Sequence, residues 1–456
     1  MVVNQIVALL NTFSRSCYNC VTMRYHADSS HNLRVLMRDL IPANIFNRLE
    51  ETGRLAEQSG VSAFVVGGLV RDLLLRQKNL DVDIAVEGDG MAFARRLADH
   101  YKGGLKIFER FATAYVVFPD GFKLDVATAR RENYAHPSAL PTVAPASLKD
   151  DLYRRDFTIN ALAIDLNTTH FGELIDYYDG LRDLKQQTIR ALHDRSFVDD
   201  PTRLFRAIRY EQRFGFRIEA RTFGLLKEAA AANLVCRLSG PRLRNEVMWL
   251  LSEKDPRRTI QRMAELDLLR FIHPRLVLTS SIKVLWRNVP KALVWWKRRF
   301  QDRPVDHALV YFIALLDCLS GRATAAVLTR LALSNRQADK VRLVKNGLGH
   351  ALRGLSKHRP LKPSAVYRLL AGLPYEGLLL LAAKAESKDV KRSLSAYLTA
   401  YQSAKPSLTG HDLKKMGLQP GPLYRKILDR LLDARLNGEV KSDAEERELA
   451  KKIAKL

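Results

Sequence analysis

The chain has 456 residues, of which 47% are hydrophobic, and it carries a formal net charge of +25 with a pI near 10.0. This length predicts more than one domain with real hydrophobic cores. The positive excess is typical of a protein that meets a polyanion, and no apolar run is long enough to span a membrane, so nucleic acid is the expected partner. A merely basic surface is the plainer alternative. Four scattered cysteines exclude a disulfide scaffold and fit a reducing cytoplasm.

The N-terminal region, residues 1–60, is expected to be an extension followed by a leading helix. Residues 1–23 contain no acidic side chain, which fits either a transit peptide or a start codon placed too early, with Met23 as the true start. Cys17 and Cys20 form a single CxxC pair that we interpret as incidental. The apolar spacing of residues 41–58 predicts a helix that covers the first strand.

The stretch from residue 63 to residue 87 organises the rest of the chain. Residues 63–66 are a continuous apolar run, which predicts a buried strand. Gly67 and Gly68 predict a sharp turn, because residues without Cβ allow the backbone to bend and to approach a ligand closely. Residues 69–76 then have helical spacing.

The next strand is predicted at residues 81–86, where acidic and aliphatic residues alternate. Asp81 and Asp83 therefore point to the same side of this strand, next to the glycine turn. Two neighbouring carboxylates repel each other, and the arrangement makes sense chiefly around a divalent cation. Oxygen ligands of this kind suit Mg²⁺, which is usually held by one or two carboxylates together with substrate phosphates.

A third acid, Asp125, follows in the last of several strand-like runs. A helix is expected at residues 91–101, and strands are expected at residues 105–108, 113–118 and 123–127. An acid on a neighbouring strand can bind metal or take the proton from an attacking hydroxyl, as phosphoryl transfer requires. Three prolines predict a loop at residues 130–151.

Two arginine-rich segments come next. The first is RRDFTINALA at residues 154–163, where arginines can bind phosphate oxygens bidentately and an amide can reach sugar or phosphate. Residues 171–192 are expected to form strand, turn and strand. From Phe197 the periodicity becomes helical, and DDPTRLFRAIR begins a helix at Pro201. Arg203, Arg206 and Arg209 share one face of it, which by itself could be a solvated stripe.

The chain resembles the bacterial tRNA nucleotidyltransferases of the class II CCA-adding type and the bacterial poly(A) polymerases. Both belong to the superfamily that includes DNA polymerase beta. The resemblance rests on GGLVRD followed by DVD at residues 67–83, on RRDFTINALA, and on DDPTRLFRAIRYEQRF at residues 199–214, where Asp199 replaces the usual glutamate. It implies an α+β nucleotidyltransferase head followed by an all-helical neck, body and tail. The implied boundaries are residues 1–60 (extension), 61–195 (head), 196–260 (neck), 261–400 (body) and 401–456 (tail).

The resemblance also implies the site. The catalytic acids would be Asp81, Asp83 and Asp125, with Asp81 and Asp83 holding Mg²⁺. Nucleotide-binding residues would be Gly67, Gly68, Arg71, Arg154, Arg155, Asp156, Asn160, Asp200, Arg203, Arg206 and Arg209. Such enzymes use no nucleic-acid template. Asp200 would accept from the exocyclic amine of cytosine or adenine, and Arg203 would donate to the ring nitrogen, so that the other bases leave costly unpaired groups.

The expected reaction is addition of AMP, CMP or both from ATP and CTP to the 3′ end of tRNA. Complete CCA-adding enzymes usually carry an acidic/basic pair in the loop after the first motif, whereas residues 135–147 contain no acid and no arginine. The loop is similar to that of the split enzymes, and we favour the A-adding form. A tail segment at residues 408–428 is basic and suits contact with tRNA phosphates. The alternatives are a poly(A) polymerase and, in another class, a non-catalytic basic RNA-binding protein.

Overall fold

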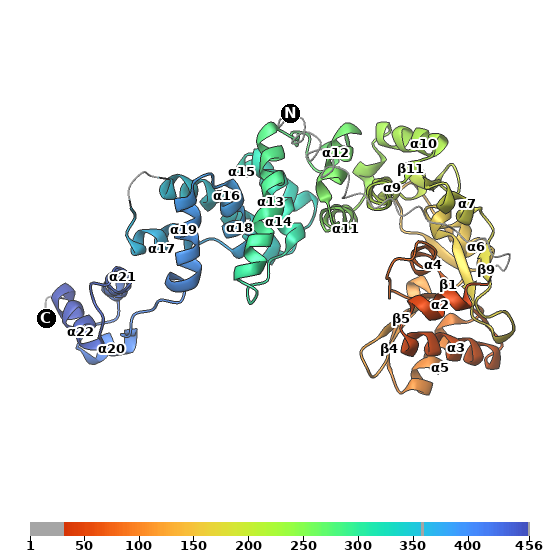
Figure 1. Ribbon diagram of the computed structural model, residues 1–456, viewed down its shortest axis with the longest axis horizontal. Helices are drawn as coiled ribbons and strands as arrows, with labels where there is room; N and C mark the ends of the chain where they lie inside the picture. The colour runs from red at the N-terminus through yellow and green to blue at the C-terminus, as the bar shows by residue number, and fades with distance from the viewer. Residues whose placement is uncertain (1–31, 357–359, 455–456) are drawn as a thin grey trace, which may run out of the picture. The chain divides into compact units, whose positions relative to one another are not determined.

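The computed structural model describes residues 32–356 and 360–454 (Figure 1). Residues 1–31, with the cysteine pair and the alternative start at Met23, lie outside the described residues. Packing divides the described chain into two compact units. The head unit comprises residues 32–106, 114–127 and 163–175, and the helical unit comprises residues 107–113, 128–162 and 176–454. The finer division into head, neck, body and tail stays a prediction.

A mixed seven-stranded sheet forms the core of the head, in the order β3-β4-β5-β2-β1-β8-β9. The central strand β1 pairs antiparallel with both β2 and β8. The predicted strands are confirmed, although β2 begins two residues later than expected. The strands are β1 (Ser62–Val66), β2 (Asp83–Glu87), β3 (Gly104–Phe108), β4 (Thr113–Val117), β5 (Lys123–Thr128), β8 (Leu162–Asp165) and β9 (Leu174–Asp176).

Four helices pack around this sheet: α2 (Arg34–Leu40), α3 (Ala43–Gln58), α4 (Gly68–Leu74) and α5 (Gly90–Tyr101). Helix α3 contacts β1 and lies beside α5 (Figure 1), which confirms the predicted covering helix. Its close approach requires glycine at one position. A Cβ at Gly53 would lie 1.7 Å from the carbonyl oxygen of Leu166, directly after β8. Any side chain there would therefore push α3 off the sheet.

The prediction of a loop at residues 130–151 is wrong. This segment contains an antiparallel ribbon of β6 (Arg130–Asn133) and β7 (Thr142–Pro145), followed by α6 (Leu148–Tyr153). The prolines do not prevent pairing because Pro137 and Pro141 lie in the connection between the two strands. Pro145 lies at the last position of its strand, opposite Arg130.

The prediction of strand, turn and strand at residues 171–192 is also incomplete. Between β9 and β10 (Thr188–Ile189) the chain forms α7 (Gly180–Lys185). Asp176 makes this helix possible, because its carboxylate accepts from the backbone N–H of Gly180 at 2.8 Å and of Leu181 at 2.9 Å. The short strand β11 (Arg217–Ile218) pairs parallel with β10 and interrupts the helical pattern that follows.

From residue 196 onward the chain is otherwise helical, which confirms the expected α+β head followed by helices. The helices are α8 (Ser196–Asp199), α9 (Thr202–Phe214), α10 (Ala220–Ala231), α11 (Gly240–Leu251), α12 (Pro256–Glu265), α13 (Ser280–Arg299), α14 (His307–Leu315), α15 (Gly321–Arg330), α16 (Asn335–Leu355), α17 (Pro363–Leu370), α18 (Tyr375–Lys384), α19 (Lys388–Ala396), α20 (Gly410–Lys415), α21 (Pro422–Leu436) and α22 (Asp443–Ala454). The last three enclose a small core of Leu408, Leu413, Ile427, Leu431 and Ala450. Helix α20 and the start of α21 form the basic tail segment at residues 408–428.

Helix α18 is apolar and is buried from Glu376 to Ala383, where it packs against α13, α14 and α16. Within the described residues, no single helix is long and apolar enough to cross a membrane. The pair α17 and α18, which is bent by 112°, meets the criteria of length and composition together. Burial of α18 among its neighbours accounts for its apolar composition.

Candidate active site

The carboxylates of the head lie where β2 begins. In the antiparallel register Asp83 is opposite Val66, the last residue of β1, so Asp83 lies directly beside the glycine turn. Gly67 has a φ of +75°, a conformation that favours glycine, and it forms the N-cap of α4. Between the two acids, Val82 is buried, whereas Asp81 is exposed. Alternation along the chain therefore directs the two carboxylates away from the core.

Asp125 lies on the neighbouring strand β5. Its backbone N–H donates to the carbonyl oxygen of Val82 at 3.1 Å, which aligns Asp125 with the residue between the other two acids. Its flanking residues Leu124 and Val126 are buried on the opposite face of the strand. Burial and the charge of Asp81 raise the pKa of the Asp125 carboxyl, and the opposing effect of Lys123 is smaller. The two carboxylates thus repel each other, and Lys123 does not fully offset this repulsion.

This donor set fits a divalent cation, because carboxylate oxygens are the hard ligands that such ions bind. Within the described parts of the chain, no three acidic, histidine or cysteine side chains are already arranged as metal ligands. The acids are therefore neighbours along β2 and β5, with their side chains not yet converged on one point.

A chain of hydrogen bonds that starts from the buried pair of Arg71 and Asp72 fixes the segment that carries Asp81. Arg71 donates from Nε and Nη2 to the carboxylate of Asp72 at 2.8 and 3.0 Å, and Asn79 donates to the same carboxylate at 2.8 Å. Asn79 in turn accepts from the backbone N–H of Asp81 at 2.9 Å. Arg71, expected to bind nucleotide, is thus engaged with Asp72. Asp72 follows Arg71 in the GGLVRD motif, but no sequence signal marked Asn79, which lies outside that motif.

The predicted nucleotide-binding arginines lie in the helical unit, where buried acids hold them. Arg154 donates to Asp151 from Nε and Nη2 at 2.9 and 2.7 Å, and to Glu132 from Nη1 at 2.9 Å. Arg155 donates from Nη2 to the second oxygen of Asp151 at 2.9 Å. Burial alone would raise the pKa of the Asp151 carboxyl, but Arg155 and Arg154 together lower it. Arg155 thus keeps more free donors than Arg154.

Asp156 and Asn160 belong to a second buried network. The Asp156 carboxylate accepts from Asn160 Nδ2 at 2.9 Å, from the backbone N–H of Phe157 at 2.9 Å and from Arg206 Nε at 2.6 Å. Although burial opposes ionisation, Arg206 and Asn160 lower the pKa of this carboxyl to about 2. The network ties RRDFTINALA to helix α9, which carries the other predicted arginines.

The predicted base-reading pair lies at the start of α9. Asp200 Oδ1 accepts from the backbone N–H and the hydroxyl of Thr202 at 2.9 and 2.6 Å, and from Arg242 Nη2 at 2.7 Å. No group in the described chain bonds its Oδ2. Arg203, 6% exposed, donates from Nη1 to the Ser196 hydroxyl at 2.7 Å and from Nη2 to the carbonyl oxygen of Arg154 at 2.5 Å. Both side chains are thus fixed before any ligand arrives.

Helix α11 supports this region. Besides Asp200, Arg242 donates to the carbonyl oxygen of Ser138 at 2.9 Å, which connects α9, α11 and the segment after β6. Glu246 lies 3.9 Å from Arg209, and its Oε2 has no hydrogen-bond partner among the described residues. Burial raises the pKa of Glu246 to about 7, against the smaller effects of Arg206 and Arg209. The guanidinium carbon of Arg209 also lies over the Trp249 ring, 5.3 Å from the ring centroid.

Tyr134 was not predicted as a site residue. Its hydroxyl donates to Glu132 at 2.7 Å. Burial and Glu132 raise the pKa of the Tyr134 hydroxyl, and the charges of Arg203 and Asp200 act on it more weakly. Tyr134 could not be predicted as a site residue, because its position depends on the pairing of β6 with β7. The prolines of residues 130–151 had favoured a loop there instead.

Comparison with known proteins shows which family the chain belongs to. The family described as "Poly A polymerase head domain" matches residues 63–190, and the family described as "Probable RNA and SrmB- binding site of polymerase A" matches residues 215–278. An A-adding tRNA nucleotidyltransferase from Halalkalibacterium halodurans is 32% identical over 89% of the chain and 91% of the relative. The chain belongs to the tRNA nucleotidyltransferase and poly(A) polymerase family.

Two further members of the tRNA nucleotidyltransferase family are informative. The A-adding tRNA nucleotidyltransferase of Geobacter sulfurreducens is 42% identical over 93% of the chain, which spans half the length of that relative. The structure titled "Thermotoga maritima CCA-adding enzyme complexed with tRNA_CCA" superposes with a TM-score of 0.71. It is 34% identical and matches 93% of this chain and 98% of its own. The family as a whole generally uses a divalent metal.

Proposed function

We propose that the chain is a template-independent nucleotidyltransferase that adds AMP from ATP to the 3′ end of tRNA, and that it acts in the cytoplasm. Relatives named as A-adding enzymes support this choice of nucleotide. The lack of acid and arginine between Tyr134 and Leu148 supports a split enzyme rather than a complete CCA-adding one. CTP is the second candidate substrate.

The observation that carries the proposal is the pattern of hydrogen bonds to the Asp200 carboxylate. All its hydrogen bonds within the described chain end on Oδ1, which leaves Oδ2 to accept from the exocyclic amine of adenine. Arg203, one turn later, has Nε available for the ring nitrogen. Guanine and uracil offer a carbonyl where adenine offers an amine, so they would leave the carboxylate facing another acceptor.

The proposed chemistry begins at the carboxylates of the head. Asp81 and Asp83 would hold Mg²⁺, which when bound neutralises charge on the triphosphate and the leaving pyrophosphate. The 3′-hydroxyl oxygen of tRNA forms a bond to the α-phosphorus of ATP, and the bond from that phosphorus to the pyrophosphate oxygen breaks. Asp125 accepts the hydroxyl proton, for which a raised pKa is suited.

The arginines are proposed to bind and orient the triphosphate. Arg155 is the best donor to phosphate, because only its Nη2 is engaged by Asp151. Arg154, with three nitrogens already bonded, positions its neighbour instead. Arg206 and Arg209 orient helix α9 through Asp156 and Glu246. In the head, Gly67, Gly68 and Arg71 form the turn that is proposed to face the phosphates.

A poly(A) polymerase is the second candidate, because the family that matches the head bears that name. One experiment separates the candidates. Purified protein is given each labelled nucleoside triphosphate, in turn, with tRNAs ending before CCA, after C and after CC, and with an unstructured RNA. A single AMP added to the CC-ending tRNA is expected. Long adenosine tails on any RNA would indicate the polymerase, and no incorporation at all would indicate a non-catalytic RNA-binding protein.

A further inference from the structure

The connection between β6 and β7 contains a backbone conformation that its sequence does not favour. Residues 136–139 form a tight turn, because the backbone N–H of Ala139 donates to the carbonyl oxygen of His136 at 3.1 Å. Pro137 is the second residue of this turn, and Ser138 is the third, with a φ of +68°. This combination is typical of a type II turn, whose third position favours glycine or asparagine. The surroundings of Ser138, rather than its own preference, therefore hold it in the left-handed region.

Two contacts of Ser138 hold the turn against other parts of the helical unit. Its hydroxyl donates to the carbonyl oxygen of Leu234 at 3.4 Å, which is a long and weak hydrogen bond. Its carbonyl oxygen accepts from Arg242 Nη1 at 2.9 Å, which is a normal length. The same guanidinium donates from Nη2 to Asp200 Oδ1 at 2.7 Å. Arg242 thus bridges the turn and the carboxylate that is proposed to select the base.

A second chain of hydrogen bonds connects the same ribbon to Arg203. Glu132, on β6, accepts from the Tyr134 hydroxyl at 2.7 Å and from Arg154 Nη1 at 2.9 Å. The carbonyl oxygen of Arg154 in turn accepts from Arg203 Nη2 at 2.5 Å. Both members of the base-reading pair are therefore held from residues 132–138, a segment that need not contact the nucleotide itself.

We propose that Ser138 is a positioning residue for base selection: its left-handed backbone directs its carbonyl oxygen to Arg242, which holds Asp200 with Oδ2 free for the incoming base. A guanidinium is planar, so its bonds through Nη1 and Nη2 together fix the plane in which the Asp200 carboxylate is held. If residue 138 relaxed to a negative φ, its carbonyl group would rotate away from Arg242. This assignment rests on the base-reading role proposed above for Asp200.

The test measures kcat/KM for ATP and for GTP with CC-ending tRNA in two variants of Ser138. Glycine tolerates the left-handed region and keeps the carbonyl, so Ser138→Gly should retain the preference for ATP within about two-fold. Valine is β-branched and disfavours a positive φ. Ser138→Val should therefore reduce the preference for ATP by about 3- to 10-fold, as expected from the loss of one hydrogen bond. KM for tRNA should not change, because Arg242 acts on the base and not on the RNA.

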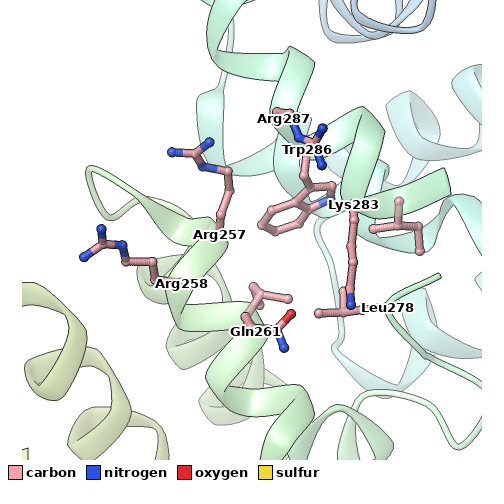
Figure 2. A pocket seen from close by; sticks show the side chains of 9 residues that line it. Arg257, Arg258, Gln261, Leu278, Lys283, Trp286 and Arg287 are labelled. Carbon is pink, nitrogen blue, oxygen red and sulfur yellow. The ribbon is translucent and has the colours of Figure 1, made fainter. Parts of the chain in front are cut away.

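A double-mutant cycle separates positioning from a general loss of structure. If Ser138 acts through Arg242, Ser138→Val should reduce the preference no further in a protein that already carries Arg242→Ala. The control is Gln261→Ala, at the cavity of about 290 Å³ between α12 and α13 (Figure 2), whose lining residues take no part in the two hydrogen-bond chains. Thermal unfolding shows whether Ser138→Val remains folded. Ser138→Thr, which is β-branched but keeps the hydroxyl, tests the same point if it does not.

Four results would overturn the proposal: an unchanged preference in Ser138→Val, an equal loss in Ser138→Gly, the same loss in the Gln261 control, or a loss that multiplies with that of Arg242→Ala. If the wild-type protein adds no AMP to any tRNA, the proposed function fails. The ratio of dissociation constants for ATP and GTP, measured by equilibrium dialysis in the same variants, then decides the role of Ser138, and equal wild-type constants would overturn it.

Discussion

Replacement of Arg242 by alanine should impair base selection more than catalysis, although Arg242 itself need not touch the nucleotide. Arg242 Nη2 donates to Asp200 Oδ1 at 2.7 Å, and this bond fixes the orientation in which Oδ2 is free. Without it, the Asp200 carboxylate can rotate about its remaining contacts with Thr202. The energy of ordering Asp200 must then be supplied when ATP binds.

The size of the effect follows from the contact. A hydrogen bond between charged groups contributes about 1.5–3 kcal/mol. The two side chains are 24% and 22% exposed, and solvent screening lowers this to about 1–2 kcal/mol. We therefore expect kcat/KM for ATP to fall by about 5- to 30-fold, with a smaller fall for UTP and GTP, which do not use the carboxylate productively.

The assay is kcat/KM for all four nucleoside triphosphates with CC-ending tRNA. Arg242→Lys keeps the charge and should recover part of the selectivity. Arg244→Ala is the matched control on the same helix, because Arg244 donates to the carbonyl oxygen of Ala332 and not to Asp200. An equal loss for all four nucleotides in Arg242→Ala, or the same loss of selectivity in Arg244→Ala, would refute the proposed role of Arg242.

Three other predictions concern metal, RNA and pH. Asp81→Ala or Asp83→Ala should reduce AMP incorporation by roughly a thousand-fold or more and leave tRNA affinity unchanged. The control Asp99→Ala, on the exposed face of α5, should not change activity. Near-normal activity of either metal-site variant with Mg²⁺ would contradict the metal assignment. Log affinity for tRNA should fall linearly with log salt, by roughly 0.7–0.9 per phosphate contact, and a flat dependence would argue against an RNA substrate. The folded-state pKa of Glu246, about 7, lies above its ordinary value of 4.5, so stability should fall by at most about 3 kcal/mol as pH rises from 4.5 to 7. Urea unfolding of Glu246→Gln should lack this part of the pH dependence, and identical profiles for the two proteins would be the contrary result.

The head could be predicted from sequence because its signals are local. The apolar run before Gly67, the alternation after Asp81 and the helical spacing of α3 each depend on residues a few positions apart. The register of β1 and β2 then brings Asp83 to the glycine turn with no further information. Where local signals conflicted with pairing, prediction failed: the prolines of residues 130–151 suggested a loop, and only the partner strand shows that they avoid the paired positions.

The arginines of RRDFTINALA and of α9 posed a different difficulty. They could be recognised from the sequence, but several of their partners could not, because these come from elements 22 to 50 residues away, such as Glu132 for Arg154 and Asp156 for Arg206. The spacing of arginines therefore predicts a charged face. It does not distinguish an arginine that binds a ligand from one that holds a neighbouring side chain in place. The distinction lies in the number of nitrogens already bonded, a property of the folded chain.

This distinction changes how a basic protein of this family should be understood. Much of the positive charge near the proposed nucleotide site is neutralised in place: Arg154, Arg155 and Arg206 all bond buried acids. Their loss would therefore leave carboxylates buried and unpaired, which is costly, so alanine scanning there measures folding together with catalysis. The cations that remain unpaired, such as Lys283 and Arg287 on α13, are the ones whose removal reports on RNA alone. A mutational map of RNA contacts should therefore begin with the unpaired cations of the helices, and the paired arginines should be tested by conservative replacement.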